Sequence, residues 1–148
     1  LQIQANSWRE NKINSDEFLL DLATILDSPE PSLYLKSLEN LSFEELISKA
    51  EEYQISGDYR NALSYYDKAI LSSIDSEEMK IIALIGKGAA LISIGEYGNA
   101  LEHYDLALEI QPSNVELLKK KAFTLAQLGL LDEARDYFEV ANLMEKLE

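Results

Sequence analysis

Small, aliphatic and aromatic residues recur at matched positions along the last two thirds of the chain. Three glycines set the register: Gly57, Gly95 and Gly129 lie 38 and 34 residues apart. The matched sets, each at a fixed offset from its glycine, are Leu46, Leu84 and Leu118; Ala50, Gly88 and Ala122; Ala62, Ala100 and Ala134; Tyr66, Tyr104 and Phe138; and Ala69, Ala107 and Ala141. A period of this length predicts one supersecondary unit per copy.

Each copy is predicted to be a pair of antiparallel helices. Two helices approach closely only where small side chains face one another and larger ones fill the space beside them. The glycine suits the turn between the helices. Helix starts are indicated by an acceptor side chain followed three residues later by glutamate. These pairs are Ser42 with Glu45, Asp75 with Glu78, and Ser113 with Glu116.

The pattern resembles the tetratricopeptide repeat, most clearly in the middle copy, GKGAALISIGEYGNALEHYDLALEIQP. The sequence of this copy is also similar to repeats common in archaeal proteins. The resemblance implies an all-α fold, a right-handed superhelical α-solenoid of antiparallel helix hairpins. Three repeats are expected, at about residues 43–76, 81–114 and 115–148. The first copy has four additional residues and no closing proline, so we expect a longer loop after it.

Lys49, Lys87 and Lys121 stand just before the small residue of each copy, where the family often has leucine. The stem of a lysine can cover apolar surface while its ammonium group reaches water. We therefore expect these three lysines to form solvated edges of the repeats.

A further helical hairpin is predicted before the repeats, at residues 14–42, preceded by an irregular arm at residues 1–13. Residues 14–27 show helical apolar spacing, and Pro29 ends that segment. We expect the hairpin to cap the exposed end of the solenoid, because a single repeat cannot bury its apolar face alone. The alternative is that the helix at 14–27 lies in a groove of its own or of a neighbouring molecule.

The resemblance also implies where a partner binds, because in this family the first helices of successive hairpins line the concave face. Carried over by position, the groove residues are Ile47, Glu51, Ile82, Ile85, Ala89, Ile92, Lys119, Phe123 and Ala126. Most of those in the middle copy are aliphatic, although a wall that faces solvent does not need to be. The alternative is that the N-terminal hairpin or another protomer covers these side chains.

An apolar groove with acidic flanks suits an amphipathic helix or an extended segment with aliphatic anchors and basic ends. The sequence therefore predicts a protein–protein interaction scaffold that binds a peptide or helix segment. The alternative is a self-associating or structural module whose groove is filled by its own or a neighbour's N-terminal helix. The last helix is a candidate surface for a homo-oligomer, because its apolar residues Val140, Leu143 and Leu147 follow helical spacing.

A subset of the family holds the C-terminal carboxylate of heat-shock chaperones with two asparagines and three basic residues. At the matching positions this chain has Ile47, Glu51, Gly86, Glu116 and Lys120. Only Lys120 could serve, and the two glutamates would repel a carboxylate. Chaperone tails are therefore disfavoured as partners.

Composition narrows the class of function. The 148 residues include 27 acidic and 13 basic side chains, a net charge of −14, so we expect neither nucleic acid nor membrane as a partner. The chain has no cysteine, which fits a reducing compartment, and we expect a cytoplasmic protein. His103 is the single histidine, and no phosphate-binding or calcium-binding loop is present. We expect no enzymatic activity, no cofactor and no metal.

Overall fold

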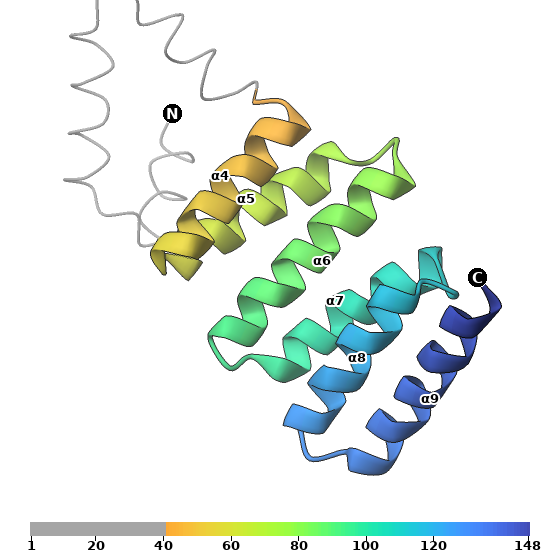
Figure 1. Ribbon diagram of the computed structural model, residues 1–148. Coiled ribbons are helices and arrows are strands. Elements are labelled where there is room, and N and C mark those ends of the chain that lie inside the picture. Colours follow the sequence, from red (N-terminus) through yellow and green to blue (C-terminus); the bar gives the residue numbers. More distant parts are fainter. Residues whose placement is uncertain (1–40) are drawn as a thin grey trace, which may run out of the picture. The chain divides into compact units, whose positions relative to one another are not determined.

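The computed structural model describes residues 41–148, which form six α-helices and contain no strand (Figure 1). The helices are α4 (Phe43–Ser56), α5 (Tyr59–Ser72), α6 (Glu77–Ser93), α7 (Tyr97–Ile110), α8 (Val115–Gln127) and α9 (Leu131–Leu147). The predicted all-α fold is confirmed. The predicted arm at 1–13 and the hairpin at 14–42, apart from its last two residues, lie outside the described residues.

Each helix pairs with its neighbours along the chain. The most extensive contacts join α4 with α5, α6 with α7, and α8 with α9, which makes three antiparallel hairpins. The hairpins then stack, with α5 against α6 and α7 against α8. Figure 1 shows the six helices following one another in a single row. The described part is therefore a short α-solenoid, as predicted.

Glycine forms the turn within every hairpin. Gly57, Gly95 and Gly129 have φ of 83°, 80° and 82°, a left-handed conformation that strains any residue with a Cβ atom. In the first hairpin the amide of Gly57 donates to the carbonyl of Gln54, and the next amide donates to Tyr53. The predicted role of these three glycines is confirmed.

Two of the three predicted helix starts are wrong by one residue. Ser42 caps α4 and forms the predicted reciprocal pair with Glu45. For α6 the N-cap is Ser76, whose hydroxyl accepts from the Met79 amide at 3.3 Å, and not Asp75. For α8 it is Asn114, and not Ser113. In both cases a second capping residue follows the predicted one and takes the extended N-cap conformation.

The expected longer loop after the first hairpin is absent. The connection from α5 to α6 comprises residues 73–76, and the connection from α7 to α8 comprises residues 111–114. The four additional residues lengthen a helix instead, because α6 has 17 residues and the equivalent helix α8 has 13. Ser76 starts α6 early enough to absorb the insertion.

The core is built from alanines and two tyrosines. All of the matched alanines of the repeats are buried, as are Tyr66 and Tyr104, which are 3% and 1% exposed. The two rings depend on two glycines of α6: a Cβ atom at Gly86 would overlap the ring of Tyr66, and one at Gly88 would overlap the ring of Tyr104. The side of α6 that faces α5 and the side that faces α7 are each shaped around one tyrosine.

Ion pairs join successive hairpins at matched positions, which corrects the prediction of solvated edges for two of the three lysines, Lys87 and Lys121. Lys87 of α6 pairs with Asp67 of α5 at 2.6 Å, and Lys121 of α8 pairs with Asp105 of α7 at 2.6 Å. Both lysine side chains are mostly buried, with 19% and 15% exposed. The ammonium group of Lys121 also lies 4.4 Å from the centre of the Tyr137 ring. These lysines align the repeats.

Candidate functional site

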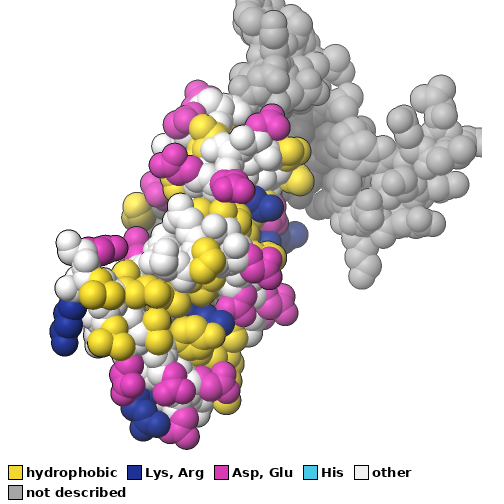
Figure 2. All heavy atoms as spheres, turned by 90° about the vertical axis from the view of Figure 1, so that its right-hand side faces the viewer, with side chains coloured by type: hydrophobic (Ala, Val, Ile, Leu, Met, Phe, Trp, Pro, Cys, Tyr) yellow, Lys and Arg dark blue, Asp and Glu magenta, His cyan; other side chains and the backbone are white. Residues whose placement is uncertain are grey.

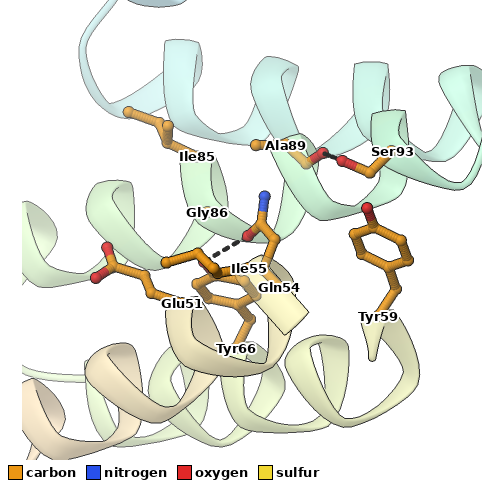
Figure 3. A pocket seen from close by; sticks show the side chains of 9 residues that line it. All are labelled: Glu51, Gln54, Ile55, Tyr59, Tyr66, Ile85, Gly86, Ala89 and Ser93. Atoms are coloured by element: carbon orange, nitrogen blue, oxygen red, sulfur yellow. Dashed lines mark hydrogen bonds between the residues drawn. The ribbon is translucent and has the colours of Figure 1, made fainter. Parts of the chain in front are cut away.

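A hollow of about 530 Å³ lies between the first and second hairpins (Figure 3). Its lining comes from α4, α5 and α6: Glu51, Gln54, Ile55, Tyr59, Tyr66, Ile85, Gly86, Ala89 and Ser93. Because Gly86 has no side chain, the floor of the hollow comes close to the buried ring of Tyr66. Aliphatic and aromatic groups thus surround a small number of polar ones.

A second hollow, of about 410 Å³, lies between the second and third hairpins. It is lined by Ala89, Ile92, Tyr104, Glu116, Lys119, Lys120 and Phe123. The two hollows share Ala89, so they adjoin along α6. Together they form one lined groove, which we call the groove from here on.

Six of the nine residues predicted for the groove line one hollow or the other. Glu51 and Ile85 line the first hollow, and Ala89 lines both. Ile92, Lys119 and Phe123 line the second. The other three line neither of these two hollows. Ile47 packs against the core cluster of the first hairpin, Ile82 is 47% exposed on α6, and Ala126 is half-buried on α8.

The phenol of Tyr66 is bound by its own hairpin. Its hydroxyl donates to the Oε1 atom of Gln54 at 2.9 Å, and Figure 3 shows this bond across the first hollow. Burial, reinforced by the negative charge of Glu51, raises the pKa of Tyr66 to about 12. The phenol therefore stays protonated, and acts as a donor, throughout the neutral pH range.

The phenol of Tyr104 has the matching position in the second hairpin but a different environment. Burial, reinforced by the negative charge of Glu116, raises its pKa to about 12. No hydrogen bond joins its hydroxyl to any of residues 41–148. No fully buried side-chain oxygen in that range lacks a partner, so the hydroxyl touches the second hollow, which the tyrosine lines.

Each charged group that lines the second hollow has an ion-pair partner. Lys119 lies 2.5 Å from Glu145 of α9, and Lys120 lies 3.5 Å from Glu116. Glu51, in the first hollow, is exposed and has no ion pair among residues 41–148. The charged residues that line the groove are therefore two glutamates, Glu51 and Glu116, and two lysines, Lys119 and Lys120, beside apolar walls.

Sequence analysis missed the two tyrosines as groove residues and assigned them only to packing. The alignment of equivalent positions in the repeats did contain a signal. Where the first hairpin has Gln54 opposite its tyrosine, the second has Ile92, so the same phenol has an acceptor in one copy and none in the other. That contrast between equivalent positions could have marked Tyr104.

Two negative findings apply to the described part of the chain. No helix within residues 41–148 is long and apolar enough to cross a membrane. No group of three or more histidine, cysteine, aspartate or glutamate side chains in the same range is arranged to hold a metal ion.

The stacked hairpins and their lined groove define an α-solenoid of the helix-repeat class. The profile of the Tetratricopeptide repeat family matches residues 46–73 and 82–114, which lie in the first and second hairpins, so the chain carries repeats of this family. The third hairpin lies outside the matched segments but keeps the same helix pairing and the same left-handed glycine.

Solved structures show the same fold at low sequence identity. The first TPR of Spaghetti (RPAP3), bound to the HSP90 peptide SRMEEVD, is 19% identical, with a TM-score of 0.62 over 72% of this chain and 81% of that chain. A crystal structure of MamA is 22% identical, with a TM-score of 0.65 over 86% of this chain and 67% of that chain. A search of curated proteins returned no significant match.

Proposed function

We propose that the repeats bind a peptide or a helical segment of another protein in the groove along α4, α6 and α8. The observation that carries this proposal is the pair of adjoining hollows, whose walls are mostly aliphatic and aromatic while their floors contain buried phenols. Ligand sites in proteins combine apolar walls with a few placed polar groups in this way. The peptide-bound tetratricopeptide structure of the same fold supports the assignment to a protein partner.

The groove also favours one chemistry of partner. Ile85, Ile92 and Phe123 supply apolar surface, and the groove includes the carboxylate of Glu51, which has no ion pair among residues 41–148. A segment with aliphatic anchors and basic flanks fits these features, and the net charge of −14 would steer it toward the protein. A chaperone C-terminal carboxylate fits less well, because Glu116 already pairs with Lys120, the one basic residue at the clamp positions.

Substitution of a groove residue tests this function. Peptides selected from a random library on the 148-residue chain would be measured against Ile85→Glu, Phe123→Glu and the control Leu106→Glu. Phe123 and Leu106 are 47% and 46% exposed, but Leu106 is on α7 and lines neither hollow. We expect the two groove variants to bind roughly tenfold more weakly or worse, because a buried apolar contact is replaced by a charge.

The control variant distinguishes a loss of groove contacts from a general effect of adding a charge. Leu106→Glu should bind the selected peptides as tightly as the unchanged chain, and circular dichroism should show the same helix content in all three variants. Peptides that tolerate both groove substitutions, or that lose affinity with Leu106→Glu alone, would place binding elsewhere and contradict the proposal.

Self-association is a second candidate function, and α9 carries the observation that favours it. Leu131, Leu143 and Leu147 of α9 are 66%, 62% and 87% exposed. Figure 2 shows hydrophobic side chains grouped on one face of the repeats, with acidic ones around them. Exposed apolar groups of this kind mark interaction surfaces. Sedimentation at two concentrations tests it: a mass that stays monomeric at both would contradict association through α9.

A further inference from the structure

The first and second hairpins present the same phenol to the groove in two different states. Tyr66 and Tyr104 both follow the turn glycine by nine residues, and both rings pack against a glycine of α6. The hydroxyl of Tyr66 is engaged by Gln54 at 2.9 Å. The position equivalent to Gln54 in the second hairpin is Ile92, which has no acceptor. The exchange of glutamine for isoleucine therefore removes the acceptor from the second hairpin.

The hydroxyl of Tyr104 has no acceptor among residues 41–148. The residue is 1% exposed, but its hydroxyl is not fully enclosed, because no fully buried side-chain oxygen in that range lacks a partner. A donor with so little accessible surface gains from a partner that replaces its remaining contact with water. The second hollow, which Tyr104 lines, gives such a partner access.

The surroundings of the hydroxyl decide which acceptor fits. Ile92 and Phe123 line the same hollow and offer apolar surface. Lys120 is paired with Glu116, and Lys119 with Glu145, so the hollow holds no unpaired cation. A carboxylate would lose hydration in this hollow without gaining an unpaired cation as a partner. A neutral carbonyl meets no such penalty.

We propose that Tyr104 donates a hydrogen bond to a neutral amide carbonyl of a peptide bound in the second hollow, with an adjacent aliphatic side chain of that peptide against Ile92 and Phe123. This inference rests on the proposed function and adds to it the group that is recognised and the residue that recognises it. Tyr104 fixes the register of the bound backbone, whereas Tyr66 has the same position and shape but is already engaged by Gln54.

The test uses a small probe and a matched control. N-acetyl-isoleucine N-methylamide, which has two amide carbonyls and one aliphatic side chain, is titrated into the isotope-labelled 148-residue chain and followed by amide chemical shifts. The experiment is repeated with Tyr104→Phe and with Tyr97→Phe, each of which removes one oxygen atom; Tyr97 is on α7 and lines neither hollow. We expect Tyr104→Phe to bind the probe roughly 2- to 10-fold more weakly and Tyr97→Phe to bind it unchanged.

The outcomes separate this inference from the function on which it rests. Equal affinity for the unchanged chain and Tyr104→Phe, with shifts still centred on Ile92 and Phe123, would overturn the role of the hydroxyl and leave the groove as the site. No binding to the unchanged chain would also overturn this inference, whereas the peptide selection described above tests the groove independently. Shifts confined to residues outside the groove would count against both.

A second probe tests the charge of the acceptor. N-acetyl-isoleucine with a free carboxylate differs from the first probe only at its C-terminal group. We expect it to bind more weakly to the unchanged chain, because its carboxylate would lose hydration without gaining an unpaired cation. Tighter binding of the carboxylate than of the amide would overturn the assignment of a neutral carbonyl.

Discussion

The junction of α5 with α6 and the junction of α7 with α8 share the same ion pair and a buried tyrosine but differ in the residues around the tyrosine hydroxyl. Each has a lysine–aspartate pair at 2.6 Å and a buried tyrosine on the earlier hairpin. In the first junction, the ring of Tyr66 lies against Gly86 of the next hairpin, and Gln54 takes its hydroxyl. In the second, the residue equivalent to Gly86 is Lys120, and the phenol of Tyr104 has no protein partner among the described residues.

This difference distinguishes the residues that pack the hairpins together from the residues that line the hollows. The alanines, the ion pairs and the tyrosine rings hold hairpin to hairpin and recur in both junctions, because any stack of repeats needs them. The groups that differ, Gln54 against Ile92 and Gly86 against Lys120, all face a hollow. A repeat protein can therefore vary its ligand chemistry at a few positions while its packing stays constant.

The largest expected effect comes from filling the space beside either tyrosine. Gly86→Ala and Gly88→Ala each add a methyl group that overlaps the ring edge of a buried tyrosine. We expect each substitution to lower the free energy of unfolding by about 1–3 kcal/mol. Gly98→Ala is the control, because its Cβ meets nothing within 4 Å, and it should be neutral or slightly stabilising. Urea unfolding followed by circular dichroism measures all three. Equal stability of the three variants would show that the rings can move aside.

A smaller effect is expected from alkaline pH. The folded-state pKa of Tyr66 and Tyr104 is about 12, above the ordinary value of about 10. The stability due to these shifts is complete below pH 10 and is lost as the pH rises from 10 through 12, because the unfolded chain gives up its phenolic protons first. We expect the urea midpoint to fall between pH 8 and pH 11.

The double variant Tyr66→Phe with Tyr104→Phe separates the phenols from the lysines, which also titrate in this range. Its urea midpoint should fall less between pH 8 and pH 11 than that of the unchanged chain. An identical fall in both proteins would assign the alkaline loss to groups other than these two tyrosines.

The smallest expected effect tests the exchange of one side chain between the junctions. Gln54→Ile gives the first junction the environment of the second, and we expect it to cost about 1 kcal/mol because the Tyr66 hydroxyl loses its acceptor. Combined with Tyr66→Phe, the substitution should cost less, since no donor is left unpaired. Urea unfolding of the two single variants and the double variant measures this coupling. Additive effects would mean that the hydrogen bond contributes nothing.

Much of the fold could be predicted from the sequence, because the features that define it are local and periodic. The glycine register gave the three turns, since a left-handed residue is needed at each, and the matched alanines gave the helix contacts. The errors arose where two residues of similar chemistry compete. Asp75 and Ser76 can both cap a helix, and only the backbone conformation decides between them.

The predicted groove residues remain a proposal, but the structure shows where they lie. Ile85, Ala89 and Phe123 line the hollows, a position that follows from helix period alone. Ile47 packs against a core cluster instead, because whether it faces the groove or the core depends on the angle between helices of one hairpin. The state of Tyr104 is also outside periodic patterns, since it depends on which side chain stands across from it in three dimensions.

The lysine–aspartate pairs between hairpins have a consequence for how such a chain can change in length. Each hairpin contributes the lysine from its first helix and the acid from its second, as Lys87 and Asp105 illustrate for the middle one. Lys49 in the first hairpin and Glu139 in the last occupy the same two positions and keep the same signs. A whole hairpin could therefore be duplicated or deleted by gene rearrangement, and the newly adjoining units would still meet with matched charges.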